Sequence, residues 1–386
     1  MEVLEEENQP PKRVKTHEPL DPEEEKEDRI SSLPDLILDE ILSRLDSTKY
    51  AIRTGTLSKR WQHLWLSASS LSFADHHMMK YSPSDYTHIF INNRTLSDFY
   101  KCVDETLTQC HHPQFKNLNK FCVRADYDNR FESHVDNWIN FATSSNVQKL
   151  DLFLDTGNEV ALYVLEDDSF FINSHFTHLV LKGCILYYPS GRIAWKNLTH
   201  LTIMNSILNQ DLMDNILSGS PLLDTLALFD CYGYSWLDIT SKTLKNLEFY
   251  GYFCQEDENL DHIININAPY ITSLSIKGTL LLWKILLRDV SSLVKAELDY
   301  IKMGHDETTP KEEKEEMLMR FILRLHHVKE LKIGRWCYPT FRRLEAKGLI
   351  FPSNLKVVKL SYHVYDSDDS TELDDSSDND SSVGDS

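Results

Sequence analysis

The sequence lacks the features that mark membrane and secreted proteins. No run of 18 or more apolar residues occurs, so we expect no membrane span. The opening segment, MEVLEEENQP, has neither the basic start nor the apolar run of a secretory signal. The seven cysteines are odd in number and never spaced as CxxC, which predicts reduced thiols and no disulfide framework. We therefore expect the protein in the nucleus, the cytoplasm or both.

Motifs of catalysis and of metal binding are also missing. The 12 glycines form no GxxxxGK[ST] or GxGxxG loop, and no GxSxG elbow is present. The histidine pairs 76–77, 111–112 and 326–327 suggest a metal site, but no second set of ligands stands at zinc-site spacing. We therefore expect no catalytic residues, no metal and no cofactor.

The net charge is small outside the two ends of the chain. Residues 1–29 carry 11 acids and 5 bases, and residues 366–386 carry 9 acids and no base, out of a net charge of −20. We expect 1–28 and 366–386 to be disordered acidic segments, since they are too polar to form a core. The nearly neutral middle disfavours a nucleic-acid partner. Residues 11–15, PKRVK, are a candidate nuclear import signal.

Residues 29–73 predict a small unit of three short helices. Pro34 suits a first helical turn, and apolar residues then recur at spacings of three and four. This first apolar face consists of Ile37, Leu38, Ile41, Leu42 and Leu45. Further on, Trp61 and Leu64 share a face of another short helix. So small a unit buries little surface and is marginal alone, which is a reason to expect a docking partner.

Residues 85–362 contain a recurring pattern, apolar-x-x-apolar-x-apolar, which occurs ten times. Its central positions are separated by 29, 29, 22, 25, 21, 27, 22, 35 and 27 residues, close to the period of leucine-rich repeats. The ten central positions are Phe121, Leu150, Leu179, Leu201, Leu226, Leu247, Leu274, Ala296, Leu331 and Val358. We predict an α/β solenoid in which each unit gives one short strand and neighbouring units share a core.

Two details of the repeat region leave alternatives open. The longest gap predicts a full helix over 311–326, either a working surface or a structural elaboration. Several aromatic residues stand between the repeat leucines and could line a recognition surface or fill the core. These are Tyr232, Tyr234, Trp236, Tyr250, Tyr252 and Trp283.

The segment from Asp28 to Leu71 closely resembles an F-box. The likeness rests on LPDLILDEILSRL, which begins at Leu33, combined with LSKRWQHLW, which begins at Leu57. With irregular leucine repeats behind it, the chain is similar to the F-box/leucine-rich-repeat proteins of plants. Many of those proteins carry a further C-terminal domain, which we expect to be absent because the acidic tail follows soon after Leu360.

The resemblance implies a substrate receptor of a Skp–cullin–F-box ubiquitin ligase. There the F-box binds the Skp-type adaptor, and through it the cullin, while the repeats hold a target protein. The adaptor-binding residues that the resemblance implies, directly or in support, are Leu33, Pro34, Ile37, Leu38, Ile41, Leu42, Leu45 and Trp61.

Two other functions remain open at this stage. The chain could be a repeat scaffold that binds a protein without entering a ligase. Alternatively, the repeat concavity could hold a small ligand that completes the target surface. An anionic ligand would need a basic pocket, and the strands show no evident cluster of Lys and Arg. The repeats also depart from the usual pattern, because no consistent Asn or Cys follows each strand.

Overall fold

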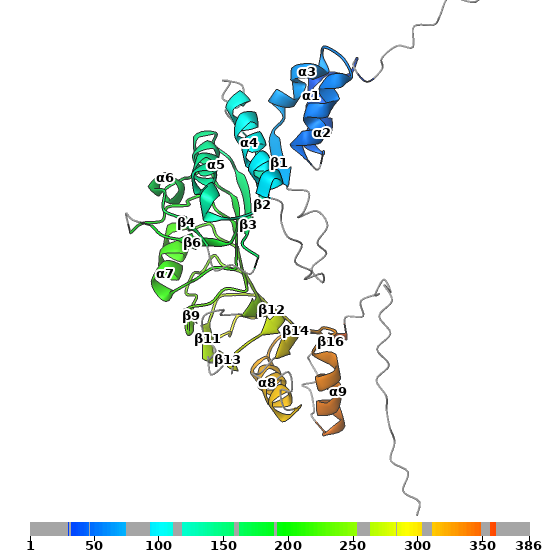
Figure 1. The fold of residues 1–386 in the computed structure, drawn as a ribbon. Coiled ribbons are helices and arrows are strands. Elements are labelled where there is room, and N and C mark those ends of the chain that lie inside the picture. The colour runs from blue at the N-terminus through cyan, green and yellow to red at the C-terminus, as the bar shows by residue number, and fades with distance from the viewer. Residues whose placement is uncertain are drawn as a thin grey trace, which may run out of the picture. The chain divides into compact units, whose positions relative to one another are not determined.

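The computed structural model describes residues 30, 32–45, 47–74, 93–110, 118–157, 162–188, 191–252, 263–282, 284–302, 311–348 and 356–359. The chain divides into two compact units, Met1–Ala68 and Ser69–Ser386 (Figure 1). The predicted disordered segments 1–28 and 366–386, and the basic cluster at 11–15, lie outside the described residues.

The first unit is helical, as predicted. Its elements are α1 (Asp35–Ser43), α2 (Thr48–Arg53), η1 (Thr54–Thr56), α3 (Trp61–Leu64) and η2 (Trp65–Ser67). Ser47 begins α2 by accepting a hydrogen bond from the amide of Lys49 at 3.3 Å, as N-cap serines do. The helices are short, so they must be stabilised by packing against one another, because the helix propensity of their residues is not sufficient.

The second unit is built on one long parallel sheet, which confirms the predicted α/β solenoid. In spatial order its strands are β1 (Ser70–Ala74), β2 (Lys120–Asp126), β3 (Lys149–Asp155), β5 (His178–Lys182), β7 (His200–Met204), β8 (Thr225–Phe229), β10 (Asn246–Tyr252), β12 (Ser273–Leu280), β14 (Lys295–Lys302), β15 (Glu330–Ile333) and β16 (Lys356–Lys359). The ten predicted repeat centres fall in the ten strands β2 to β16 of this order, and β1 is an eleventh strand that the pattern did not predict.

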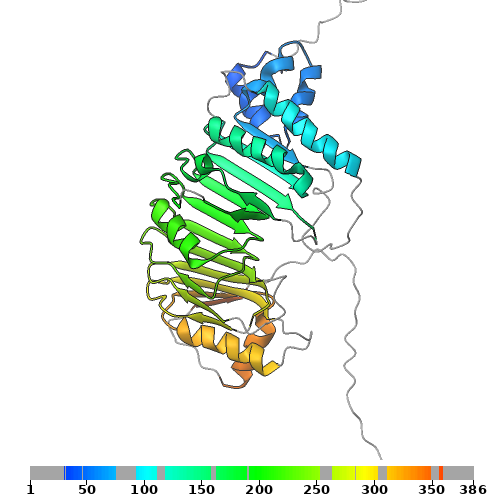
Figure 2. The same cartoon turned by 60° about the vertical axis from the view of Figure 1, so that its left-hand side comes forward.

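Helices and shorter strands complete each turn of the solenoid. They are α4 (Asn93–Gln109), η5 (Asn129–Phe131), α5 (Glu132–Ser144), β4 (Tyr163–Leu165), α6 (Asp168–Phe171), β6 (Cys184–Leu186), α7 (Gln210–Gly219), β9 (Trp236–Asp238), β11 (Ile263–Asn267), β13 (Lys284–Leu287), α8 (Lys311–Arg324) and α9 (Tyr338–Ala346). Helices α5, α6 and α7 lie along one face of the long sheet, and no described helix covers the opposite face, which we call the open face (Figures 1 and 2). Helix α8 confirms the helix predicted over 311–326.

The strand residues alternate between the core and the open face. In β3, for example, Leu150, Leu152 and Leu154 are at most 1% exposed, while the residues between them are half-buried. Each repeat contributes such residues, so the core runs continuously between the sheet and the elements behind it.

A row of left-handed residues stands at or near the ends of the central strands. It consists of Gly183, Asn205, Asp230, Gly251 and Gly278, with φ between 47° and 76°. Glycine, asparagine and aspartate adopt this conformation at least cost. The ladder continues through the row, since the amide of Gly183 donates to the carbonyl of Met204 at 3.0 Å, and that of Asn205 to the carbonyl of Phe229 at 2.9 Å.

Small buried polar residues follow that row in three adjacent turns: Cys184, Ser206 and Cys231, none more than 1% exposed. The Ser206 hydroxyl donates to the carbonyl of Cys184 at 2.6 Å, and the Cys231 thiol donates to the carbonyl of Ile203 at 3.4 Å. Burial raises the pKa of both thiols to about 12, so they remain protonated hydrogen-bond donors. The sequence pattern showed no consistent Asn or Cys after each strand. In these three turns, small buried polar residues occupy that place, and Ser206 and Cys231 donate hydrogen bonds to the backbone of the preceding turn.

Helices α4 and α5 are joined by a half-buried carboxylate, Asp104. It accepts hydrogen bonds from Trp138 Nε1 at 2.8 Å and from His134 Nδ1 at 2.6 Å. We expect Asp104→Ala to lower the free energy of unfolding by about 2–3 kcal/mol, because the buried indole N–H loses its acceptor. Asp98→Ala, an exposed position on the same helix, should change it by less than about 0.5 kcal/mol. Urea titration of both variants tests this, and equal effects would contradict it.

Candidate functional site

The helical unit encloses a very small core. Its large buried side chains are Leu38 and Leu42 from α1, Trp61 from α3, and Trp65, all at most 6% exposed. Three of the predicted adaptor-binding residues therefore lie inside the unit. Leu38, Leu42 and Trp61 hold the helices in place, and a partner does not reach them directly.

The other predicted residues lie next to this core stripe on the outside. Ile37 and Ile41 are 48% and 39% exposed and share one face of α1. Leu33 and Leu45, four residues before and after them, are half-buried, and Pro34 is exposed. These side chains form an apolar stripe on the surface of α1. It lies beside the buried stripe of Leu38 and Leu42, because Ile37 and Ile41 each precede one of those residues by one position.

The structure adds exposed apolar residues that the sequence reasoning did not select. Leu36 on α1 is 82% exposed and Leu57 is 62% exposed, and Tyr50 and Ile52 on α2 are 46% and 38% exposed. The sequence could have indicated them, because they are large apolar residues at positions that do not share the helical spacing of the core residues. We call Leu36, Ile37, Ile41, Tyr50, Ile52 and Leu57 the exposed apolar set. It is larger than the set of big side chains that the unit buries.

The two halves of the F-box-like motif meet through an ion pair. The guanidinium of Arg60, in the SKRW stretch, donates to the carboxylate of Asp35 in the LPD stretch. Trp61 beside it inserts into the core, 2% exposed. The motif residues thus fix the start of α3 against the start of α1, which sets the position of the apolar stripe.

In the second unit, the aromatic residues left open by the sequence divide into two groups. Tyr234 and Tyr252 are at most 6% exposed and belong to the core, whereas Trp236 and Tyr250 are each 42% exposed. Tyr250 lies on the open face of the sheet and stacks on Phe229 of the neighbouring strand, with ring centroids 5.1 Å apart. Trp283 lies outside the described residues.

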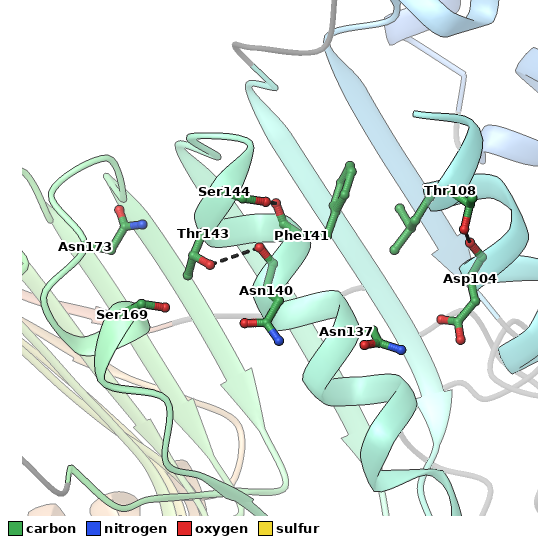
Figure 3. Close-up of a pocket in the computed structure, with 10 residues that line it drawn as sticks. Asp104, Thr108, Asn137, Asn140, Phe141, Thr143, Ser144, Ser169 and Asn173 are labelled. Atoms are coloured by element: carbon green, nitrogen blue, oxygen red, sulfur yellow. Dashed lines mark hydrogen bonds between the residues drawn. The ribbon is translucent and has the colours of Figure 1, made fainter. Parts of the chain in front are cut away.

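A polar hollow of about 740 Å³ lies among α4, α5 and α6 (Figure 3). Amide and hydroxyl side chains such as Asn137, Asn140 and Thr143 line it. Its one carboxylate, Asp104, is already engaged by Trp138 and His134. No pair of acid and base of the kind that drives catalysis is assembled in this hollow.

Within the described part of the chain, no group of three or more His, Cys, Asp or Glu side chains could hold a metal ion. Of the histidine pairs, 76–77 and 111–112 lie outside the described residues. His326 and His327 contact the backbone carbonyls of Leu323 and Val290. The six described cysteines are free. No described helix has the length and apolar character needed to span a membrane.

A helical unit with an exposed apolar set, followed by a parallel-strand solenoid, defines a class of protein-binding adaptor. Comparison with known families agrees. An F-box domain model matches residues 30–73, and a model described as "FBD-associated F-box protein At5g56370, LRR repeats" matches residues 135–298.

Individual relatives from Arabidopsis thaliana match most of the chain. F-box/LRR-repeat protein At3g03360 is 31% identical over 84% of this chain and 63% of its own length. F-box/LRR-repeat protein At5g02910 is 31% identical over 86% of this chain and 66% of its own length. F-box protein At5g03100 is 31% identical over 84% of this chain and 94% of its own length. The chain spans less than two thirds of the first two. It belongs to the F-box/leucine-rich-repeat family, as its sequence predicted.

Proposed function

We propose that this chain is the substrate receptor of a Skp–cullin–F-box ubiquitin ligase. Membership of the family supports an adaptor role in general. The observation that carries the finer proposal is the exposed apolar set, which a unit with so small a core leaves uncovered. Exposed apolar surface of this kind marks protein-binding sites. Its occupant in this proposal is the Skp-type adaptor, through which the chain joins a cullin.

The chain would act by proximity and not by its own chemistry. One unit binds the ligase and the repeats hold the target, so the target's lysines experience a high effective concentration of activated ubiquitin. We place the protein in the nucleus or the cytoplasm, where thiols stay reduced. Fractionation of cells that express a tagged chain tests this, and secretion would contradict it.

Adaptor binding by surface variants tests the proposal. Leu36→Glu combined with Ile41→Glu should weaken binding to a purified Skp-type adaptor by at least about tenfold, because charges replace apolar contacts in a desolvated interface. Neither residue is needed for the core, since both are exposed. Titration calorimetry on the intact chain and the double variant gives the two affinities.

Leu323→Glu is the matched control, since Leu323 is 58% exposed on α8 of the other unit. It should leave adaptor binding unchanged. Equal binding by all three proteins would contradict docking through the exposed apolar set. A folded intact chain that binds no adaptor would contradict the ligase role itself.

A further inference from the structure

Four solvent-facing side chains line up across the open face of the sheet. The strand register places Lys120, Lys149, His178 and His200 at equivalent positions of β2, β3, β5 and β7. Neighbouring strands are about 4.8 Å apart, so the row extends over about 14 Å. We call these four residues the His–Lys row. The sequence pattern showed no evident cluster of Lys and Arg on the strands, and the register is what brings these two lysines and two histidines together.

The two imidazoles of the row are stacked and held in the same tautomer. Their centroids are 4.4 Å apart and their planes differ by 6°. The Thr177 hydroxyl donates to the carbonyl of Gln148 at 3.0 Å, which leaves its oxygen to accept from His178 Nδ1, also at 3.0 Å.

The same arrangement repeats on the next strand. The Thr199 hydroxyl donates to the carbonyl of Thr177 at 2.9 Å and accepts from His200 Nδ1 at 2.8 Å. Each neutral ring therefore keeps its Nε2 as an acceptor.

Cations slightly outnumber carboxylates at one end of the open face. The outward positions of strands β2 to β7 hold four cations, Lys120, Arg124, Lys149 and Lys182, and three carboxylates, Asp126, Asp151 and Asp155. The corresponding positions from β8 to β15 hold three cations and four carboxylates. These are Lys277, Lys295, Lys332, Glu248, Glu297, Asp299 and Glu330.

Nearby carboxylates do not compensate the whole row. Lys120 pairs with Asp151 at 2.7 Å, and Lys182 pairs with Asp155 at 2.6 Å. Lys149 forms no ion pair with any described residue. A half-buried ammonium in a row with two imidazoles favours an anionic partner.

A second row of mixed character runs along the same strands, four residues further on. Arg124 covers the ring of Phe153, with 4.5 Å from its Cζ to the centroid, and Lys182 and Met204 follow in the same row. Phe229 and Tyr250 continue this row on β8 and β10. Because four residues of a strand cover about 13 Å, one segment of a partner could contact both rows.

We propose that the open face over β2, β3, β5 and β7 binds an acidic segment of the target protein. The carboxylates of that segment would lie over Lys149, His178 and His200, and its apolar side chains would contact Phe153 and Met204. This inference rests on the proposed function, because it names the class of target segment that the repeats hold. The acidic character of the segment is inferred from charge complementarity, because a neutral or basic segment would leave Lys149 without a counterion.

Acidification should strengthen this contact. Burial, His200 and Lys149 lower the pKa of His178, so the free imidazole is neutral near pH 7.5. The groups that face the pair are Lys149 and Asp151 from β3, and from β8 Thr225, whose hydroxyl donates to Asp224. A bound carboxylate favours the imidazolium, so binding takes up protons and the affinity rises as the pH falls.

Binding of a defined probe to the full-length chain tests the proposal. The probe is a fluorescent peptide of about eight residues, Glu with Leu at every third position, long enough to cross the four strands. Its control peptide has Gln in place of Glu. Anisotropy should show binding of the Glu peptide that strengthens at least about fivefold from about pH 7.5 to about pH 5.5, and little binding of the Gln peptide.

Variants assign the binding to the row. Lys149→Ser should weaken binding about fivefold, whereas Lys295→Ser, at the equivalent position of β14, should change it less than about twofold. His178→Gln combined with His200→Gln should remove the dependence on pH. Equal binding of both peptides, or equal effects of the two lysine variants, would overturn the proposal.

Two further outcomes separate this inference from its alternatives. Binding that appears only after the acids of 366–386 are replaced by Asn and Gln would assign the surface to the chain's own tail and overturn the proposed occupant. Adaptor binding is measured on the same preparations. A chain that binds adaptor but not the Glu peptide refutes this inference alone, and the reverse result refutes the ligase role while the acidic-segment surface stands.

Discussion

Replacing Gly183 by alanine should lower the free energy of unfolding of the repeat unit by about 3–5 kcal/mol. Gly183 has φ +73°, and a Cβ there would lie 2.2 Å from the carbonyl oxygen of Leu154 in the neighbouring turn. The substitution therefore adds a steric conflict with backbone to the cost of a left-handed alanine. Because neighbouring turns stabilise one another, the damage should spread beyond one repeat.

Gly157→Ala provides the matched control. Gly157 has a similar φ of +57°, but nothing lies within 4 Å of the position of its Cβ. Its cost should be the conformational strain alone, about 1–2 kcal/mol. Urea titration of the two variants separates strain from steric conflict. Equal losses would show that the left-handed row does not determine how closely the turns stack.

Replacing Trp61 by alanine should unfold the helical unit and abolish adaptor binding. Trp61 is 2% exposed, and removing a buried tryptophan costs about 3–5 kcal/mol. The described residues of this unit include four large buried side chains, so the loss of one removes a large part of its core. Limited proteolysis should then cleave the variant within residues 30–68, a segment in which we expect the intact protein to resist cleavage.

Leu57→Glu should separate folding from binding in the same unit. Leu57 is 62% exposed, so its replacement should leave the protease resistance of residues 30–68 unchanged while adaptor binding falls. Together the two variants distinguish the residues that hold the helices from those that meet a partner. Undiminished adaptor binding by Trp61→Ala would show that the core assigned here does not support the docking surface.

Hydrophobic spacing predicted the main elements because it follows directly from burial. The ten repeat centres mark ten strands, since a strand that buries one face must alternate, and Lys311–Arg324 is helical because Met317, Phe321 and Ile322 share a face. Strand β1 was not predicted because the first position of its repeat is the small Ala68 and because Leu71 was assigned to the F-box-like segment. The left-handed row escaped because Gly183, Asn205 and Asp230 share a backbone conformation and not a residue type.

The docking residues were harder to predict than the fold. Leu38 and Ile41 have the same apolar character in sequence, yet one is fully buried and the other is 39% exposed. Only the packing of α3 and η2 against α1 decides which stripe is covered. The His–Lys row has the same cause, because Lys120 and His200 are 80 positions apart in the chain and are brought together by the register alone.

The central claim is that this chain connects a ligase to a target through an F-box. Its most direct test is size-exclusion chromatography with light scattering on the full-length chain mixed with a purified Skp-type adaptor at about 10 μM each. We predict a single complex with one copy of each protein, lost in the Leu36→Glu, Ile41→Glu variant. Separate elution of the adaptor and a well-folded chain would contradict the claim, and the repeats would then belong to a scaffold outside the ligase.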